Sequence, residues 1–166
     1  MLVLGIDPGI ATTGYGFVKT NPAGNPELVA YGVLSTSATS STSMRLTSLY
    51  DQVRELIRQY QPDACALEKL FFQKNIKTAM TVSEARGVIS LCISQAGFEP
   101  AEYTPSEVKQ AVTSNGNAPK SQVQEMVKFI LEMDEIPKPD DAADALAIAI
   151  CHLSHARYKR LIDEQG

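Results

Sequence analysis

Cysteine is scarce in this chain, and its few cysteines are widely spaced. The three thiols, Cys65, Cys92 and Cys151, do not form the closely spaced pairs that bind a metal as thiolates. An odd number of cysteines in apolar surroundings favours reduced, buried thiols, as in a cytosolic protein. The sequence therefore predicts neither a disulfide scaffold nor a thiolate metal site.

Long hydrophobic runs are also missing. No apolar stretch approaches the roughly 20 residues that cross a bilayer. The first apolar run, which begins at Leu2, is too short for the core of a signal peptide and has no basic leader. We therefore expect a cytoplasmic protein without a membrane segment. A length of 166 residues, of which 44% are hydrophobic and 20% charged, is typical of one globular domain.

Basic residues are not in excess. There are 15 Lys and Arg against 19 Asp and Glu, which gives a formal net charge of −4. This balance argues mildly against a protein that binds nucleic acid nonspecifically. Net charge does not reveal where the charges lie, however, and a basic rim beside a cation-filled acidic site could still face a polyanion.

Acidic residues follow or precede apolar segments at three places. Residues 2–6 end at Asp7, residues 64–67 end at Glu68, and Asp141 and Asp144 open an alanine-rich apolar segment. Short apolar runs of this kind, bounded by turn formers, are typical of buried strands. Ligands of open α/β sheets bind at the carboxyl ends of the strands, so these acids are candidates for one site.

The hydrophobic pattern alternates between strand and helix periodicity along the chain. It predicts strands over residues 2–7, 14–18, 28–34, 64–67 and 99–103, and helices from 46 to 60, from 78 to 96, after Thr104, near 123–131 and from about 141 to 161. This order indicates an α/β fold with a mixed, five-stranded sheet flanked by helices. It resembles the ribonuclease H-like arrangement.

The acids suggest a metal site because clustered carboxylates repel one another unless protons or cations compensate them. Asp141 and Asp144 are three residues apart and share a helix face. We expect Asp7, Glu68, Asp141 and Asp144 to hold two Mg²⁺ ions, with Mn²⁺ as the alternative, one activating water and one stabilising a departing 3′ oxygen. Each acid alone is better explained as a cap or a turn residue, and only the four together make a metal site an equally good explanation; Asp140 is better explained as a cap or a solvated acid.

Several motifs, in this order and spacing, resemble the family of RuvC-type Holliday junction resolvases, the crossover junction endodeoxyribonucleases. The resemblance covers Leu4 to about His152. We therefore expect residues 1–157 to form a nuclease domain and residues 158–166 a charged C-terminal tail. The motifs are Gly5-Ile6-Asp7-Pro8-Gly9, Thr13-Gly14-Tyr15-Gly16, Leu67-Glu68 with Phe71 and Lys74-Asn75, Glu84-Ala85-Arg86-Gly87-Val88, Val108-Lys109-Gln110, Lys120-Ser121-Gln122-Val123-Gln124, and the run from Asp141 to Ala149.

The resemblance implies a bacterial endonuclease of recombination and repair. It implies a homodimer that uses a divalent metal to nick two opposed strands of a four-way DNA junction, with the RuvA and RuvB branch-migration proteins as partners. The family's catalytic and metal-binding carboxylates fall on the four acids named above. Its DNA-contacting positions fall on Phe71, Lys109 and Lys120, and Lys74 is expected to add to a basic rim near Glu68.

Paired cuts require two active sites, and residues 78–96 are the candidate helix for a two-fold interface. That helix could instead only pack on the sheet. Two departures from the family pattern are the acidic net charge and Asp140, the additional acid before the last motif.

Other functions share some of these features. The run Asp7-Pro8-Gly9 also resembles a phosphate loop of actin-like sugar kinases, but the chain has no second such loop. A non-catalytic junction-binding module would not need four acids, whereas a ribonuclease H or a transposase core would share the metal chemistry. His152 and His155 could form a soft-metal site, although packing histidines near a helix end are the better explanation.

Overall fold

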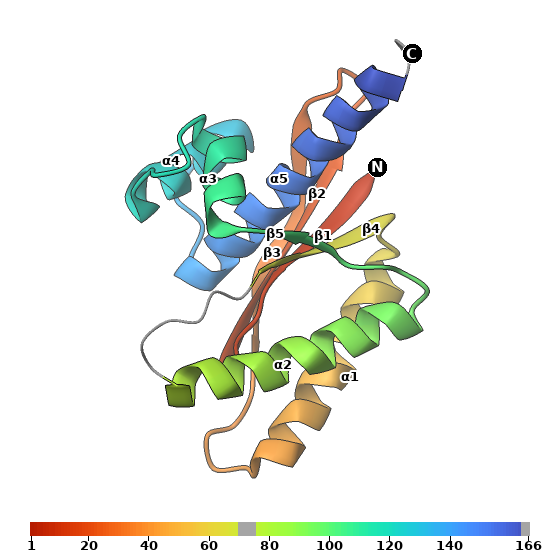
Figure 1. Cartoon of the computed structure of the whole chain (residues 1–166), viewed down its shortest axis with the longest axis vertical. Helices are drawn as coiled ribbons and strands as arrows, with labels where there is room; N and C mark the ends of the chain where they lie inside the picture. The colour runs from red at the N-terminus through yellow and green to blue at the C-terminus, as the bar shows by residue number, and fades with distance from the viewer. Residues whose placement is uncertain (70–75, 164–166) are drawn as a thin grey trace.

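The computed structural model describes residues 1–69 and 76–163, without the side chains of residues 76–78. Strands and helices follow one another as expected (Figure 1). Within the described residues, no helix is long and apolar enough to span a membrane. The elements are β1 (Leu2–Asp7), β2 (Thr12–Thr20), β3 (Pro26–Ser35), α1 (Thr42–Tyr60), β4 (Ala64–Glu68), α2 (Ile76–Gln95), β5 (Ala101–Tyr103), α3 (Pro105–Thr113), α4 (Lys120–Ile130) and α5 (Asp140–Asp163).

The five strands form one mixed sheet in the order β3-β2-β1-β4-β5. The first three strands are an antiparallel meander, whereas β4 and β5 run parallel to β1. This confirms the predicted mixed, five-stranded sheet flanked by helices. Strand β5 is shorter than predicted: the sequence predicts a strand over residues 99–103, and only residues 101–103 pair with β4.

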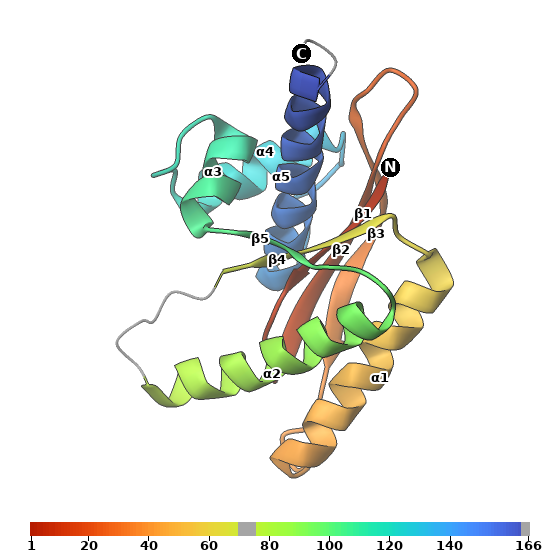
Figure 2. The ribbon, with the colours of Figure 1, turned by 45° about the vertical axis from the view of Figure 1, so that its right-hand side comes forward.

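Helices cover both faces of the sheet (Figures 1 and 2). Side chains alternate along β1, so that Val3 joins the core beneath α3, α4 and α5, while Leu4 and Ile6 join the core beneath α1 and α2. The three cysteines are buried and free, in agreement with the sequence. Burial raises the pKa of Cys65 and of Cys151 to about 12, which keeps both as thiols.

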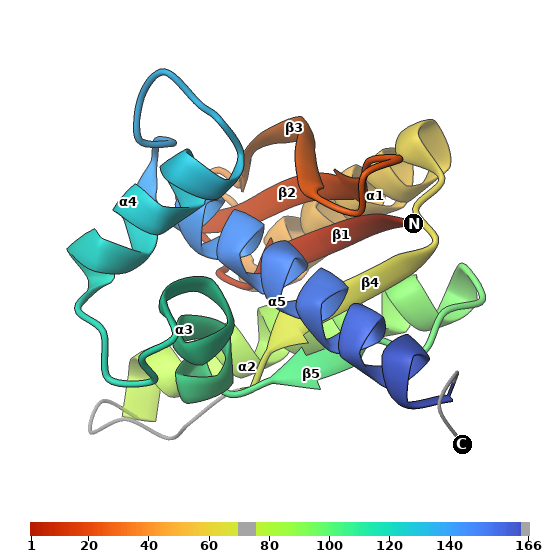
Figure 3. The ribbon, with the colours of Figure 1, turned by 90° about the horizontal axis from the view of Figure 1, so that it is seen from above.

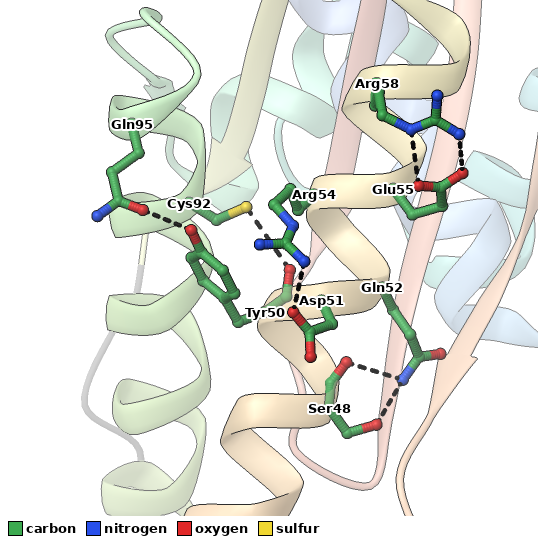
Figure 4. Close-up of polar contacts among 9 residues, drawn as sticks. All are labelled: Ser48, Tyr50, Asp51, Gln52, Arg54, Glu55, Arg58, Cys92 and Gln95. Carbon is green, nitrogen blue, oxygen red and sulfur yellow. Dashed lines mark hydrogen bonds and ion pairs between the residues drawn. The ribbon is translucent and has the colours of Figure 1, made fainter.

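Polar contacts connect α1 to α2 (Figure 4). The Tyr50 hydroxyl donates to Gln95 Oε1 at 2.5 Å, and the Cys92 thiol donates to the Tyr50 carbonyl at 3.7 Å. Ion pairs within α1, such as Arg58 to Glu55 at 2.6 Å, lie on its exposed side. The inner face of α1 therefore packs on the sheet and on α2, and its outer face is solvated.

Helix α5 lies unusually close to the sheet because glycines leave room for it. A methyl group on Gly5 would collide with the carbonyl oxygen of Ala145, and one on Gly14 with the carbonyl oxygen of Asp141. On the helix side the facing residues are small, including Ala142 and Ala145, which are buried. The apolar segment that begins α5 is thus buried, as expected, and its position depends on small residues in both partners.

The start of α3 also confirms a local prediction. Thr104 caps the helix, its hydroxyl accepting from the Glu107 amide at 3.1 Å, while Glu107 Oε2 accepts from the Thr104 amide at 2.7 Å. Pro105 occupies the first turn. This reciprocal capping box defines where α3 leaves β5.

Candidate active site at the carboxyl edge of the sheet

Two of the four candidate acids are the last residues of neighbouring parallel strands. Asp7 ends β1 and Glu68 ends β4, and the register pairs Ile6 with Leu67 one residue earlier. Both carboxylates therefore lie at the same edge of the sheet, the edge at which ligands bind in α/β folds. Figure 3 shows α5 beginning on this side.

The other two acids come from the first turns of α5. In the β1–β2 ladder Asp7 is opposite Gly14, and Gly14 in turn lies against the backbone of Asp141. Asp144 follows one turn later on the same helix. A glycine in β2 thus allows α5 to bring Asp141 and Asp144 next to the end of β1, as the sequence predicts.

The electrostatics show that these carboxylates share one environment. The pKa of Asp7 is raised to about 7. Burial is the larger cause, and repulsion from Asp144, Glu68 and Asp141 adds to it. The pKa values of Glu68 and Asp144 are also raised, again chiefly by burial. A cluster of partly buried acids with raised pKa values needs protons or cations for stability.

Lysines supply part of the missing positive charge. Lys120, the first residue of α4, donates to Asp144 Oδ2 at 2.8 Å. Burial lowers the pKa of Lys120, but the bond to Asp144 and the nearby acids outweigh it, so the net pKa is raised. Lys109 on α3 is close enough to Glu68 to counteract the rise in its pKa. The structure therefore brings two of the expected DNA-contacting lysines to the acids.

The donor set suits a hard divalent cation. Carboxylate oxygens are the protein ligands that Mg²⁺ and Mn²⁺ prefer. Across residues 1–69 and 76–163, no three His, Cys, Asp or Glu side chains are already drawn together as they would be around one ion. Lys120 neutralises part of the charge of Asp144. The chemistry of the four carboxylates fits a hard divalent cation.

Some predicted contacts lie outside the described residues. Phe71 and Lys74 belong to the segment between β4 and α2, which is not among the described residues. Their DNA-contacting roles stay predictions.

The histidines of α5 pack against Tyr103. The Tyr103 hydroxyl lies 2.9 Å from His152 Nδ1, and the His155 ring lies 4.9 Å from the Tyr103 ring. Burial lowers the pKa of His152. Both histidines thus have Tyr103 as a packing partner, which favours packing over a soft-metal site.

Sequence reasoning missed a pair of residues that face each other beside the acids. Gln124 Nε2 donates to Asp140 Oδ1 at 3.0 Å, and Asp140 Oδ2 lies 3.4 Å from the Lys120 ammonium. The sequence signal was available only in part, since Gln124 follows Lys120 by one helical turn and Asp140 precedes Asp144 by one turn. The contact between the first turn of α4 and the first turn of α5 is visible only in the tertiary structure.

Comparisons with known proteins agree with the motifs and the geometry. The family model for crossover junction endodeoxyribonuclease RuvC matches residues 3–152. A crossover junction endodeoxyribonuclease RuvC from Caldicellulosiruptor saccharolyticus is 52% identical over 153 residues, 92% of this chain and 92% of the relative. One from Moorella thermoacetica is 51% identical over 160 residues, 96% of this chain and 95% of the relative.

Solved structures give the same answer. T. thermophilus RuvC in complex with a Holliday junction substrate superimposes with a TM-score of 0.86 at 35% identity, covering 95% of this chain and 96% of that one. Ydc2, the yeast mitochondrial Holliday junction resolvase, is similar in fold alone, with a TM-score of 0.68 at 17% identity over 98% of this chain and 85% of that one. The expected ribonuclease H-like fold is confirmed, and the chain belongs to the RuvC family of crossover junction endodeoxyribonucleases.

Proposed function

We propose that this chain resolves four-way DNA junctions by divalent-metal-dependent hydrolysis of a phosphodiester in each of two opposed strands. The observation that carries the proposal is the placement of four carboxylates, from β1, β4 and α5, at the carboxyl edge of the sheet, where three of them raise the pKa of the fourth, Asp7. Repulsion between neighbouring carboxylates lowers the stability of the fold, and a role in binding cations explains why the acids are nevertheless placed together.

The chain's own residues divide the work. Asp7, Glu68, Asp141 and Asp144 hold the cations and orient them. When bound, two Mg²⁺ or Mn²⁺ ions supply an activated water and a stabilising charge for the departing 3′ oxygen. Lys109 and Lys120 contact the phosphates beside them.

The residues that precede α2 complete the proposed DNA contacts. Phe71 stacks on an unpaired base at the junction, and Lys74 adds positive charge near the same strand. The chain works in the cytoplasm as a homodimer, and the RuvA and RuvB branch-migration proteins bring it its substrate.

A cleavage assay tests this function. A mobile four-way junction, a linear duplex of the same sequence and an RNA–DNA hybrid are incubated with Mg²⁺, with Mn²⁺ or with chelator. We expect paired, symmetric nicks in the junction alone, and none with chelator. Binding without cutting under every condition would indicate a junction-binding module, and equal cutting of duplex or hybrid would contradict junction specificity while keeping the metal chemistry.

Metal binding is expected to depend steeply on pH. Because the pKa of Asp7 is about 7 in the fold, a cation that binds there must displace a proton at lower pH. Mn²⁺ affinity should therefore fall about tenfold for each pH unit below 7 and level off above it. Titration calorimetry at pH 6 and 8, in buffers of different ionisation enthalpy, measures both affinity and released protons. Equal affinity at the two pH values, with no proton release, would contradict it.

The outer face of α2 supports the proposed homodimer. Met80 and Leu91 on α2 are 61% and 53% exposed, and Gly87 between them is also exposed, with open space around its Cα. The inner face of the same helix packs Ala85 and Ile89 into the core. The outer stripe is therefore available for a second copy, and the glycine permits close approach.

Leu91→Glu is expected to convert the dimer into a folded monomer and to abolish paired nicking, because it buries a charge in the interface. Phe129→Glu is the matched control, since Phe129 on α4 is 76% exposed and lies on another surface. Sedimentation equilibrium measures the mass of each variant. A Leu91→Glu protein that remains dimeric would place the interface elsewhere.

A further inference from the structure

Lys120 lies between two carboxylates of α5, and only one of them belongs to the proposed metal site. Its ammonium is 2.8 Å from Asp144 Oδ2 and 3.4 Å from Asp140 Oδ2. Asp144 is the inner partner, with a side chain that is 32% exposed, whereas the side chain of Asp140 is 67% exposed. The two acids are one turn apart, so one ammonium can contact both.

Asp140 is held in place by a separate contact. Gln124 Nε2 donates to Asp140 Oδ1 at 3.0 Å, which leaves Oδ2 for Lys120. Gln124 is one turn beyond Lys120 on α4. Each oxygen of Asp140 therefore faces its own partner, and the first turn of α4 is matched to the first turn of α5. Asp140 is largely exposed, as expected of a solvated acid, and these two contacts orient it toward Lys120.

We propose that Asp140 is a positioning residue for Lys120, giving its ammonium a second partner outside the carboxylate cluster. Lys120 can then release Asp144 when a cation arrives without losing all charge compensation, and it stays beside the site to meet a DNA phosphate. The inference rests on the proposed function, in which Asp144 binds metal and Lys120 contacts phosphate.

The physical consequence concerns competition for Asp144. A cation that binds Asp144 must displace the ammonium, and this displacement costs less when Asp140 still holds Lys120. Without the Asp140 charge, Asp144 is the one ion-pair partner that Lys120 keeps among the described residues, and Lys120 resists displacement. Without Lys120, Asp144 has no ion-pair partner among the described residues to compete with the cation, and Asp140 has no ammonium to position.

A double-mutant cycle on Mn²⁺ binding tests the proposal without DNA or activity. Mn²⁺ affinity is measured by calorimetry at pH 8 in about 0.2 M salt. At this salt concentration the Debye length is below about 8 Å, so charges farther from the site have little effect on the affinity. Asp140→Asn is expected to weaken Mn²⁺ binding about threefold to tenfold, and Lys120→Gln to strengthen it. In the Lys120→Gln background, Asp140→Asn should change the affinity by less than about twofold.

Matched variants separate positioning from general charge. Asp134→Asn removes an exposed acid from the connection between α4 and α5 and is expected to leave Mn²⁺ affinity unchanged. Gln124→Ala should reproduce part of the Asp140→Asn effect, and Asp140→Glu should restore most of the affinity. Circular dichroism of each variant verifies that the effects do not come from unfolding.

The outcomes are distinct. An equal loss from Asp140→Asn in both backgrounds would show that Asp140 acts only through its charge, and the inference would be wrong. No loss in the wild-type background would also overturn it. If Asp7→Asn leaves Mn²⁺ affinity unchanged, the metal assignment itself fails, which is a different result from an absent coupling between Asp140 and Lys120.

Discussion

Asp7→Asn is expected to reduce junction nicking by at least about 100-fold while leaving junction binding in chelator nearly unchanged. Asparagine keeps the size of the side chain and removes the negative charge at the centre of the cluster. Asp7 ends the central strand β1, and its pKa of about 7 reflects burial and repulsion from the other acids. Losing this charge removes a cation ligand without disturbing the surfaces that contact DNA.

The same variant is expected to be more stable than the wild type at pH 8 in chelator. Asp7 ionises near 3.8 in the unfolded chain and near 7 in the fold, so the folded protein holds an extra proton between these values. Wild-type stability therefore falls as pH rises from about 4 to about 7, and the loss is complete above the folded pKa. Asparagine does not titrate, so the variant escapes this loss.

Thermal unfolding measures the difference. Each kcal/mol of relieved repulsion raises the unfolding temperature of a chain of this size by about 2–4 °C. The gain should be largest at pH 8 and shrink toward pH 5, where Asp7 is protonated in the wild type. Glu99→Gln, an exposed acid that precedes β5, is the control and should show no such pH dependence. A destabilised Asp7→Asn at pH 8, or one that still nicks, would contradict the account.

Gly14→Ala is expected to cost both stability and activity. The added methyl group would collide with the Asp141 carbonyl, an atom of the α5 backbone that cannot rotate away. Overpacking of this kind costs about 1–3 kcal/mol and sometimes more, so the unfolding temperature should fall by several degrees. Because α5 must move away from β2, Asp141 and Asp144 move away from Asp7, and Mn²⁺ binding should weaken with nicking.

Gly116→Ala is the matched control for this substitution. Its methyl group meets chiefly the Ser106 hydroxyl, the end of a side chain that can turn aside. Circular dichroism and Mn²⁺ titration of both variants compare the two positions. A Gly14→Ala protein that retains wild-type stability and Mn²⁺ affinity would show that the close approach of α5 does not position the acids.

Most of the fold could be predicted from local patterns in the sequence. The apolar runs that end at Asp7 and Glu68 predicted the strands and the edge at which these acids meet. The pair Thr104 and Glu107 predicted the start of α3, because a capping box needs only residues three apart. Such features depend on neighbours in the chain, so the sequence suffices.

The remaining features depend on which elements meet in space. Gly14 reads locally as a strand residue, and its role in admitting α5 appears only when β2 and α5 are packed together. Lys120 was expected to contact DNA, and its ion pairs with Asp140 and Asp144, which are 20 or more residues away in the sequence, were not predicted. The hydrophobic periodicities of 2 and 3.6 residues predict which face of a strand or helix is buried, but not which elements come into contact.

The central claim is that Asp7, Glu68, Asp141 and Asp144 form one metal centre, and anomalous scattering from crystals grown with Mn²⁺ at pH 8 tests it most directly. We expect anomalous peaks at the carboxyl edge of the sheet, within coordination distance of these carboxylates, with Lys120 withdrawn from Asp144 toward Asp140. Their absence there, or peaks beside His152 and His155 instead, would contradict the account.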